Sequence, residues 1–188
     1  MKISRLKIKE VLEIRPDPIL DSRGSFSETF RKDILESFVG QNINFCQENE
    51  STSVSNVFRG LHYQLFPFAQ SKLISVVEGK ILDFIVDIRK GSSTFGKNIQ
   101  IELSDKNKKQ VFIPRGFAHG FHILSKEATI VYKVDNYYSK IHDRVININD
   151  TKLNLNIDLK TIILSDKDFN APNLADADLF NINDDLYE

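Results

Sequence analysis

The sequence predicts an all-β fold. Apolar and polar residues alternate along the middle of the chain, and short apolar runs recur with turn residues between them, whereas a helical pattern is confined to the flanks. Alternation at every second residue is typical of a half-buried strand, and regularly spaced short strands are typical of a sandwich or a barrel. We therefore expect a β-sandwich or β-barrel with short flanking helices.

Two segments near the ends of the chain are expected outside the sheets. Arg31–Val39 places three apolar residues on one helical face, which predicts a short surface helix. The last stretch, Asp176–Glu188, is acidic and carries apolar residues at irregular intervals. We expect it to pack as a short helix or as a tail.

The strands are predicted from apolar periodicity and from turn residues. Ile99, Ile101 and Leu103 alternate with polar residues and predict one half-buried strand. The runs Lys72–Val77 and Ile81–Ile88 are separated only by a short link that contains glycine, which predicts a hairpin. Five further strands are predicted, at Gln110–Ile113, Gly120–Leu124, Thr129–Val134, Val145–Ile148 and Leu153–Leu159.

Length and composition favour one domain with one core. A chain of 188 residues falls within the usual size of a single domain, and neither a repeat nor a linker divides it. Hydrophobic residues make up 41% of the chain, which is enough to build that core. We therefore expect a single domain over residues 1–188.

The charge and cysteine counts exclude several kinds of protein. The 25 Lys and Arg residues and 26 Asp and Glu residues give a formal net charge of -1, so no broad cationic field favours nucleic acid. Cys46 is the single cysteine, which excludes an intramolecular disulfide and suits a reducing compartment. The N-terminal residues lack the apolar core of a signal peptide, and no stretch approaches the roughly 20 apolar residues of a membrane helix. We expect a cytoplasmic protein that binds neither nucleic acid nor membrane.

Two of the four histidines lie in glycine-rich segments at predicted strand edges. His62 and His119 each have a glycine within two residues. Such glycines let two backbones approach closely, and barrels use them to aim a side chain into a ligand cavity. The alternative is a buried histidine that is hydrogen-bonded to backbone. His122 and His142 lie among solvent-facing neighbours and are expected to be structural.

The spacing around His62 does not fit a metal site. The residue two positions after His62 is Gln64 rather than a second histidine, and Lys72 stands where a carboxylate ligand would be needed. An ammonium group there would repel a divalent cation rather than bind it. We therefore expect neither a metal nor another cofactor.

Three cations in apolar or glycine-rich surroundings predict a local site for an anion. Arg23, Arg59 and Lys72 stand apart from the mixed-charge segments that hold most lysines of this chain. The planar fork of an arginine matches phosphate oxygens. For Arg23 the alternative is an ordinary surface ion pair with Asp21 or Glu28.

Tyr132 alternates with Ile130 in an apolar run and should point to the same face. A phenol that faces the interior of a barrel needs a hydrogen-bond partner. Tyr132 is therefore either a hydrogen-bonded core tyrosine or a proton donor.

Seven segments of the chain resemble, in order, the dTDP-4-dehydrorhamnose 3,5-epimerase family. They lie between about Ile8 and Pro172 and are Asp21–Glu28, Gln47–Asn49, Arg59–Gln64, Ser92–Lys97, Ile113–Phe121, Asn136–Tyr138 and Leu164–Asp168. The resemblance implies a cupin-type jelly-roll barrel and a homodimer with exchanged N-terminal strands. It also implies metal-free epimerisation at C3 and C5 of a dTDP-linked 4-keto-6-deoxy sugar.

The resemblance further implies a role for individual residues. His62 matches the family's catalytic base, Asp168 the carboxylate that orients this base, and Tyr132 the acid on the opposite face of the sugar. Lys72 and Arg59 match residues around the keto oxygen and the diphosphate. His119 matches a second histidine of the pocket, and the nucleotide-contacting positions, some of which reach across the dimer, are matched by Arg23, Phe26, Glu28, Gln47, Asn49 and Tyr138.

The chemistry of epimerisation asks for residues of the same kinds. A hydrogen next to a ketone is acidic only because the negative charge can move onto the ketone oxygen, so the site needs a base at carbon and a cation at oxygen. His62 and Lys72 supply these two groups. Inversion then requires a proton from the other face of the planar enolate, for which Tyr132 is suited.

The chain departs from the family pattern in two places. Ile146–Asp150 stands where the family usually has Trp-Asn-Asp, and Leu155–Asp158 replaces a Gly-Ile-Glu-Trp pattern. Two alternatives therefore stay open: an epimerase that acts at one carbon or on another 4-keto sugar, and a noncatalytic cupin that binds nucleotide sugars. The presence of His62, Tyr132 and Asp168 together counts against the noncatalytic protein.

Overall fold

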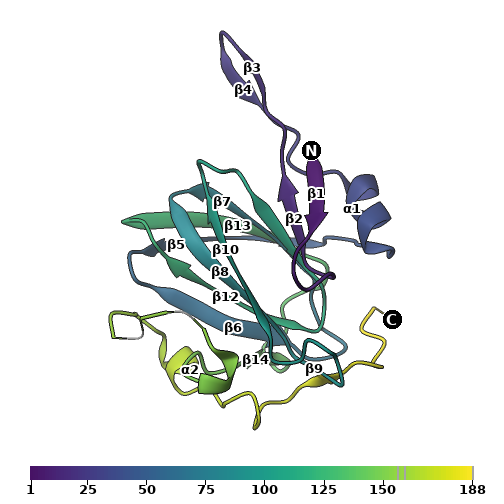
Figure 1. Ribbon diagram of the computed structural model, residues 1–188, viewed down its shortest axis with the longest axis vertical. Helices are drawn as coiled ribbons and strands as arrows, with labels where there is room; N and C mark the ends of the chain where they lie inside the picture. The colour runs from purple at the N-terminus through teal and green to yellow at the C-terminus, as the bar shows by residue number, and fades with distance from the viewer. Residues whose placement is uncertain (156, 159, 188) are drawn as a thin grey trace.

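Two antiparallel sheets packed face to face form the body of the protein (Figure 1). The computed structural model describes residues 1–155, 157–158 and 160–187. The six-stranded sheet has the order β1 (Lys2–Arg5), β2 (Leu12–Arg15), β11 (Gln110–Ile113), β7 (Lys72–Glu78), β13 (Glu127–Val134) and β5 (Gln47–Val54). The five-stranded sheet has the order β10 (Asn98–Ser104), β8 (Lys80–Asp87), β12 (Phe117–Ile123), β6 (Phe58–Gln64) and β14 (Asp143–Val145). The predicted all-β jelly roll with short flanking helices is confirmed.

A core of aliphatic and aromatic side chains fills the space between the two sheets. Ile74 and Val76 of β7 and Ile130 of β13 meet Ile85 and Phe121 from the opposing sheet. Side chains two residues apart on a strand point to the same face. Lys72 is two residues before Ile74 on β7, and Tyr132 is two residues after Ile130 on β13, so both side chains also point between the sheets. They lie at one end of the core.

The predicted hairpin between Lys72–Val77 and Ile81–Ile88 is wrong, because the two strands belong to different sheets. β7 pairs with β11 and β13, whereas β8 pairs with β10 and β12. Gly79 forms the corner between the sheets with φ of 80°, and a Cβ there would lie 2.2 Å from the carbonyl oxygen of Glu127. A glycine in a short link thus marks a change of sheet here rather than a tight turn.

Of the other predicted strands, some are confirmed and two are largely wrong. Gln110–Ile113 is β11, and the runs at 99–103, 120–124 and 129–134 lie largely within β10, β12 and β13. Of Val145–Ile148 only Val145 is in a strand, and the predicted strand Leu153–Leu159 begins in a 3₁₀ turn and continues without regular structure, with residues 156 and 159 outside the described residues. Ile146, Ile148 and Leu153 are buried against the outer face of the five-stranded sheet. Their apolar character reflects this burial and not strand pairing.

The predicted helix is confirmed as α1 (Lys32–Val39), which buries Leu35 and ends at Gly40 with φ of 79°. A second short helix, α2 (Asp166–Phe169), was not predicted. The acidic C-terminal stretch is an extended tail rather than a helix, because its strand β15 (Phe180–Asn181) pairs in parallel with β9 (Arg89–Lys90). No helix within the described residues is long and apolar enough to cross a membrane.

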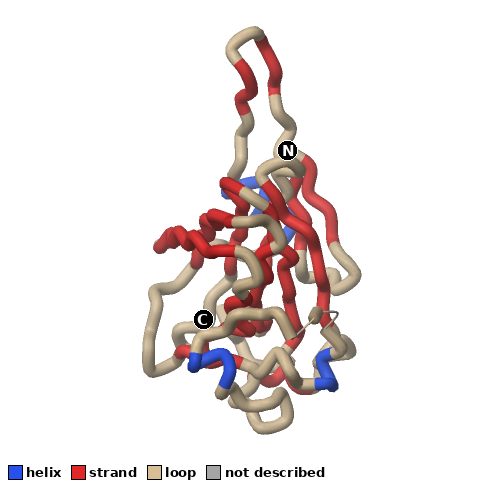
Figure 2. The backbone as a smooth tube through the Cα atoms, turned by 90° about the vertical axis from the view of Figure 1, so that its left-hand side faces the viewer, coloured by secondary structure: helices blue, strands red, loops and turns tan. Residues whose placement is uncertain are grey.

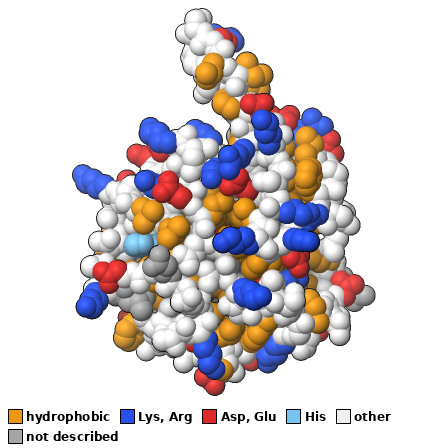
Figure 3. All heavy atoms as spheres, in the orientation of Figure 1, with side chains coloured by type: hydrophobic (Ala, Val, Ile, Leu, Met, Phe, Trp, Pro, Cys, Tyr) orange, Lys and Arg blue, Asp and Glu red, His pale blue; other side chains and the backbone are white. Residues whose placement is uncertain are grey.

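One hairpin stands away from the two sheets. It consists of β3 (Ile19–Asp21) and β4 (Gly24–Phe26) and projects from the body in both perpendicular views (Figures 1 and 2). Ile19, Leu20 and Phe26 are about 70% exposed there. The space-filling view shows hydrophobic side chains uncovered on this projection (Figure 3). Monomeric proteins rarely expose such a group of neighbouring apolar side chains unless a partner covers it.

Candidate active site

A cavity of about 620 Å³ opens at the end of the core where Lys72 and Tyr132 lie. Strands of both sheets and helix α2 contribute to its walls. Eight residues singled out from the sequence line it, namely Gln47, Asn49, Arg59, His62, Lys72, Tyr132, Tyr138 and Asp168. The fold therefore brings together side chains that are up to 121 positions apart in the chain, from Gln47 to Asp168.

His62 and Asp168 form a hydrogen-bonded pair in this cavity. His62 Nε2–H donates to Asp168 Oδ1 at 2.6 Å, and the Asp168 side chain is almost completely buried. Burial alone would raise the pKa of Asp168, but the hydrogen bonds and the charge interaction with His62 outweigh it and lower this pKa. An ionised Asp168 accepts the Nε2 proton, so Nδ1 of His62 is left as a proton acceptor.

Helix α2 and strand β6 fix this pair from both sides. The Ser165 hydroxyl accepts a hydrogen bond from the backbone N–H of Asp168 and caps the first turn of the helix. The backbone N–H of Gly60 approaches the second oxygen of Asp168 at 3.4 Å. The carboxylate is thereby oriented toward His62.

A bulge at Gly60 turns two polar residues of β6 into the cavity. The register between β6 and β12 shifts at Gly120, where β6 carries one extra residue. A Cβ on Gly60 would lie 2.5 Å from the Gly120 Cα, and Gly60 has φ of 133°, so this position needs glycine. Residues three apart on a regular strand point to opposite faces, but the bulge lets both Arg59 and His62 line the cavity. The expected close backbone approach beside His62 is confirmed.

Lys72 presents a buried ammonium group next to His62. It is 9% exposed, and its Nζ donates to the carbonyl oxygen of His62 at 3.3 Å. Burial lowers the pKa of Lys72 to about 8, against the opposing influence of Asp143 and Asp83. Lys72 is still mainly protonated at neutral pH and supplies a positive charge within a poorly solvated site.

Tyr132 faces the cavity from the sheet opposite His62. It lies on β13, whereas His62 lies on β6 of the five-stranded sheet. Burial raises the pKa of Tyr132, and the nearby Arg59 lowers it by less. Its hydroxyl therefore keeps its proton at neutral pH. A proton donor and a proton acceptor thus face the same space from two sides.

His119 lies behind the cavity rather than on its wall. It is paired with His62 in the register of β12 and β6, and its Nε2 is 2.8 Å from Asp83 Oδ2. Burial raises the pKa of Asp83 and lowers that of His119, so both groups tend toward their neutral forms. The described residues that line the cavity do not include His119. The His119 side chain is instead buried against Asp83.

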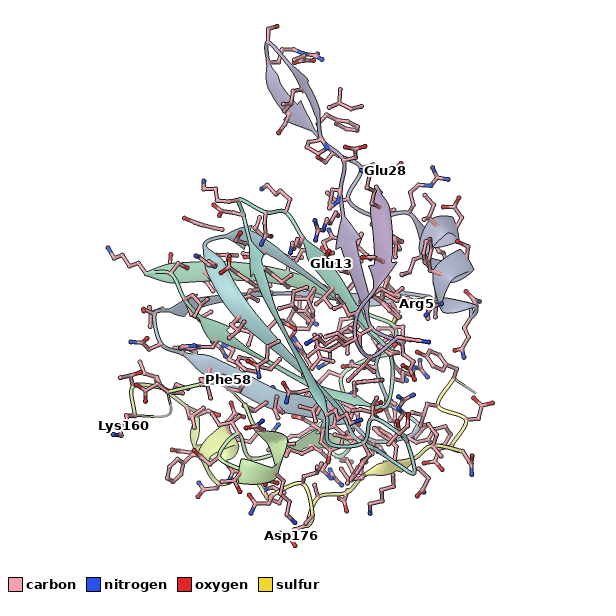
Figure 4. All side chains as sticks on the ribbon, viewed as in Figure 1. Arg5, Glu13, Glu28, Phe58, Lys160 and Asp176 are labelled. Atoms are coloured by element: carbon pink, nitrogen blue, oxygen red, sulfur yellow. The ribbon has the colours of Figure 1, made fainter. Side chains whose placement is uncertain are left out.

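Three residues expected to contact the nucleotide lie on or beside the projecting hairpin. Arg23 pairs with Asp21 at 2.6 Å and has 88% of its side chain exposed, as the ion-pair interpretation predicts. Phe26 is also exposed, and Glu28 lies 3.9 Å from Arg31. Figure 4 shows Glu28 at the base of the hairpin, well away from the cavity residue Phe58. Within one chain these residues do not reach the cavity.

Several cavity residues were missed by sequence reasoning. Asp143 Oδ2 accepts hydrogen bonds from Tyr138 at 2.9 Å and from Lys167 at 2.5 Å, and all three residues line the cavity. Lys167 directly precedes Asp168 and could have been found from that position. Asp83, which is buried against His119 and does not line the cavity, also left a signal, because it is the one acidic residue within the apolar run Ile81–Val86.

No group of three or more His, Cys, Asp and Glu side chains suited to a metal ion occurs within the described part of the chain. The absence of a metal from the reaction stays a prediction.

The amide pair Gln47 and Asn49, joined at 2.8 Å on edge strand β5, adds uncharged donors and acceptors to the wall near Tyr138. The cavity wall thus carries uncharged polar groups beside its charged ones.

Comparison with known proteins gives one consistent result. The family model for dTDP-4-dehydrorhamnose 3,5-epimerase matches residues 5–176. The dTDP-4-dehydrorhamnose 3,5-epimerase of Shigella flexneri is 46% identical over 180 residues, which are 96% of this chain and 99% of the relative. The relatives also include solved structures of similar length.

Two solved structures show how far the likeness extends. A dTDP-6-deoxy-D-glucose-3,5-epimerase from Legionella pneumophila Philadelphia 1, in complex with dTDP-4-keto-L-rhamnose, superposes with a TM-score of 0.91 at 40% identity, covering 96% of this chain and 97% of the other. A 3'-monoepimerase from Streptomyces bikiniensis, in complex with dTDP-quinovose, gives a TM-score of 0.86 at 31% identity, covering 92% and 87%.

Proposed function

Because the chain belongs to the dTDP-4-dehydrorhamnose 3,5-epimerase family, we propose that it converts dTDP-4-dehydro-6-deoxy-D-glucose to dTDP-4-dehydro-L-rhamnose by inverting C3 and C5. The observation that carries this proposal is the placement of His62 and Tyr132 on opposing sheets around one cavity. An epimerase must take a proton from one face of a carbon and return one to the other. The two walls of this cavity offer an acceptor and a donor for those steps.

Proton removal falls to His62 in this mechanism. The hydrogen bond to Asp168 occupies Nε2, so Nδ1 is the nitrogen that accepts the proton from C3 or C5 of the sugar. Asp168 then stabilises the imidazolium that results. A base positioned in this way contributes about 10²–10⁴-fold to the rate.

Lys72 stabilises the intermediate. When the C–H bond breaks, its electron pair moves into the ring and the negative charge collects on the C4 oxygen. The Lys72 ammonium is held beside His62 by burial and by its hydrogen bond to the His62 carbonyl. A fixed positive charge at a developing oxyanion is worth more in a poorly solvated site than in water.

Tyr132 delivers the proton that inverts the centre. Its raised pKa supports a protonated phenol at neutral pH, and its position on β13 places it across the cavity from the base. Before the second carbon reacts, the phenolate takes a proton from solvent and the His62 imidazolium releases one to solvent. Arg59, whose Nε donates to Ser53 on β5 at 2.9 Å and whose charge lies near Tyr132, is suited to the diphosphate.

The nucleotide lies, in this proposal, against Gln47, Asn49 and Tyr138 of the cavity wall. The projecting hairpin completes the site in a homodimer with exchanged N-terminal strands. Its exposed apolar side chains need a cover, and neither Arg23 nor Phe26 is among the described residues that line the cavity of their own chain. On the surface of a second copy, Arg23 would leave its surface pair with Asp21 for a phosphate and Phe26 would contact the base.

A second candidate function is inversion at one carbon only. The likeness to the 3'-monoepimerase from Streptomyces bikiniensis supports it, because that enzyme shares the fold at 31% identity. The higher identity to the 3,5-epimerases, 46% for the relative from Shigella flexneri, favours inversion at both carbons.

Incubation of the enzyme with the 4-keto sugar nucleotide in heavy water tests the proposal. Each inverted centre takes its new hydrogen from solvent, so the expected product carries deuterium at both C3 and C5. Deuterium at a single carbon would replace the proposal with the one-carbon activity. A substrate that binds without any exchange would indicate a noncatalytic protein.

A further inference from the structure

The C-terminal tail places a half-buried tyrosine, Tyr187, beside the end of the six-stranded sheet from which Lys72 enters the cavity. From β15 the tail runs past β9 (Figure 1), and Leu186 is buried within the same cluster as Phe180. Tyr187 follows directly, and its ring packs under the guanidinium of Arg115 with 4.9 Å between the Arg115 Cζ and the ring centre. These contacts of Tyr187 have no role in the mechanism proposed above.

The hydroxyl of Tyr187 is tied to two segments that are distant in sequence. It accepts a hydrogen bond from the backbone N–H of Arg115 at 3.2 Å and shares a second, of 2.9 Å, with the Ser71 hydroxyl. Ser71 is completely buried, so the hydroxyl pair is shielded from water. Removal of the Tyr187 oxygen would leave buried polar groups without partners.

Asp135 and Arg115 complete the arrangement. The Asp135 carboxylate accepts from the backbone N–H of Ser71 at 2.6 Å and from Arg115 Nε at 3.1 Å. Arg115 Nη1 in turn donates to the carbonyl oxygen of Leu186 at 2.6 Å, and both charged side chains are at least nine-tenths buried. We call the four residues Ser71, Arg115, Asp135 and Tyr187 the tail clamp.

The tail clamp sits where three strands of the six-stranded sheet end side by side. In the sheet register Lys72 lies between Ile113 of β11 and Val134 of β13. Ser71 directly precedes Lys72, and Asp135 directly follows Val134. The clamp therefore holds the backbone at the point from which Lys72 enters the cavity.

We propose that the C-terminal tail, through the hydrogen bond of Tyr187 to Ser71, is a positioning element that fixes the Lys72 ammonium over the substrate's keto oxygen. The inference rests on the proposed function, because it assumes the role of Lys72 given above. Tyr187 touches neither substrate nor reacting atoms and acts only through Ser71. A displacement of about 1 Å at a catalytic group can cost up to about 100-fold in rate.

Tyr187→Phe tests the proposal because it keeps the ring under Arg115 and removes only the hydroxyl. We expect kcat to fall about tenfold with KM unchanged. Exchange and inversion should fall in proportion, since Lys72 serves the enolate that both share. Ser71→Ala should give the same loss, and the double variant no further loss, because both changes break one bond.

The pH dependence of kcat separates positioning from a loss of stability. The ionisable groups that face Lys72 are His62, Asp83, His119, Asp143 and Lys167, from β6, β8, β12, β14 and α2. Burial sets the pKa of Lys72 to about 8, so kcat should decline above that pH in the wild type. A strand end that loosens admits water to the ammonium, and the decline should then move to higher pH in both variants.

Asp184→Ala is the matched control, because Asp184 accepts a hydrogen bond from the Asn181 N–H within the same tail without touching the clamp. It should leave kcat and its pH profile unchanged. The inference would be overturned if Tyr187→Phe had the wild-type kcat, or if its kcat were lower but the pH profile did not move. If Tyr187→Phe does not fold, the same two outcomes are read from Ser71→Ala. Absence of exchange in the wild-type enzyme would instead contradict the proposed function.

Discussion

Replacement of Lys72 by methionine should stabilise the protein while it removes activity. Burial lowers the pKa of Lys72 from 10.5 to about 8, which means that the folded state disfavours the charged form. One pKa unit corresponds to about 1.4 kcal/mol, so keeping this ammonium in the fold costs roughly 3 kcal/mol at neutral pH. Methionine has a similar length and no charge, and Lys72→Met should raise the free energy of unfolding by up to that amount.

The size of this effect changes with pH in a defined window. The pKa of Lys72 is lower in the folded than in the unfolded state, so the unfolded chain binds an extra proton between about pH 8 and 10.5. The advantage of Lys72→Met is therefore complete below pH 8 and vanishes as the pH approaches 10.5. Urea unfolding of both proteins at several pH values measures it.

A surface lysine provides the control for this experiment. Lys80 is half exposed and lies 3.7 Å from Glu102, so Lys80→Met should change stability by less than about 0.5 kcal/mol. The Lys72 variant should also lose about 10²–10³-fold in kcat, because it lacks the cation at the oxyanion. A Lys72→Met protein that is less stable than the wild type at pH 7 would refute the reasoning about burial.

Three further outcomes are expected. His62→Ala should lower both exchange and epimerisation to less than about a hundredth of the wild-type rate while nucleotide binding, measured by calorimetry, stays intact; a higher residual rate would contradict its role as base. Dialysis against EDTA should leave activity unchanged, and stoichiometric zinc, iron or manganese that is lost together with activity would overturn the metal-free mechanism. Mixing Arg23→Ala with His62→Ala subunits should restore activity above that of either variant alone, because one site of the mixed dimer would then be intact; no gain would place Arg23 outside the partner's site.

Sequence patterns located the strands with a sustained apolar run and missed strands that are short, interrupted or polar. Among the missed strands, β2 is only four residues long, β6 is interrupted by the bulge at Gly60, and β5 is polar. β5 (Gln47–Val54) is an edge strand whose residues are polar except for the last, and its inward positions line a polar cavity wall, so it has no apolar period to detect. Ile146, Ile148 and Leu153 fall in segments predicted as strands, but they are buried against a sheet without belonging to one of its strands. Periodicity reports burial, and it predicts a strand only where burial and pairing coincide.

The sequence indicated which single residues carry chemistry more readily than it indicated which residues they contact. Lys72, Arg59 and His62 attract notice because a cation or a histidine beside glycines or within apolar residues is unusual. The pairing of His62 with Asp168, 106 positions later, is set by the docking of α2 on β6 and leaves no local pattern. The resemblance to a known family supplied that partner, and the geometry now gives it a physical basis.

In the proposed mechanism His62 and Tyr132 act on opposite faces of one enolate, and the Tyr132→Phe variant separates their two roles. This change removes the proton and keeps the ring, so proton removal by His62 and charge stabilisation by Lys72 should continue. In heavy water the variant should still exchange substrate hydrogen for deuterium, because the base can return a proton to the face from which it came. We predict that inversion falls much more than exchange. An unchanged ratio of inversion to exchange would contradict this mechanism and leave Tyr132 as a core tyrosine.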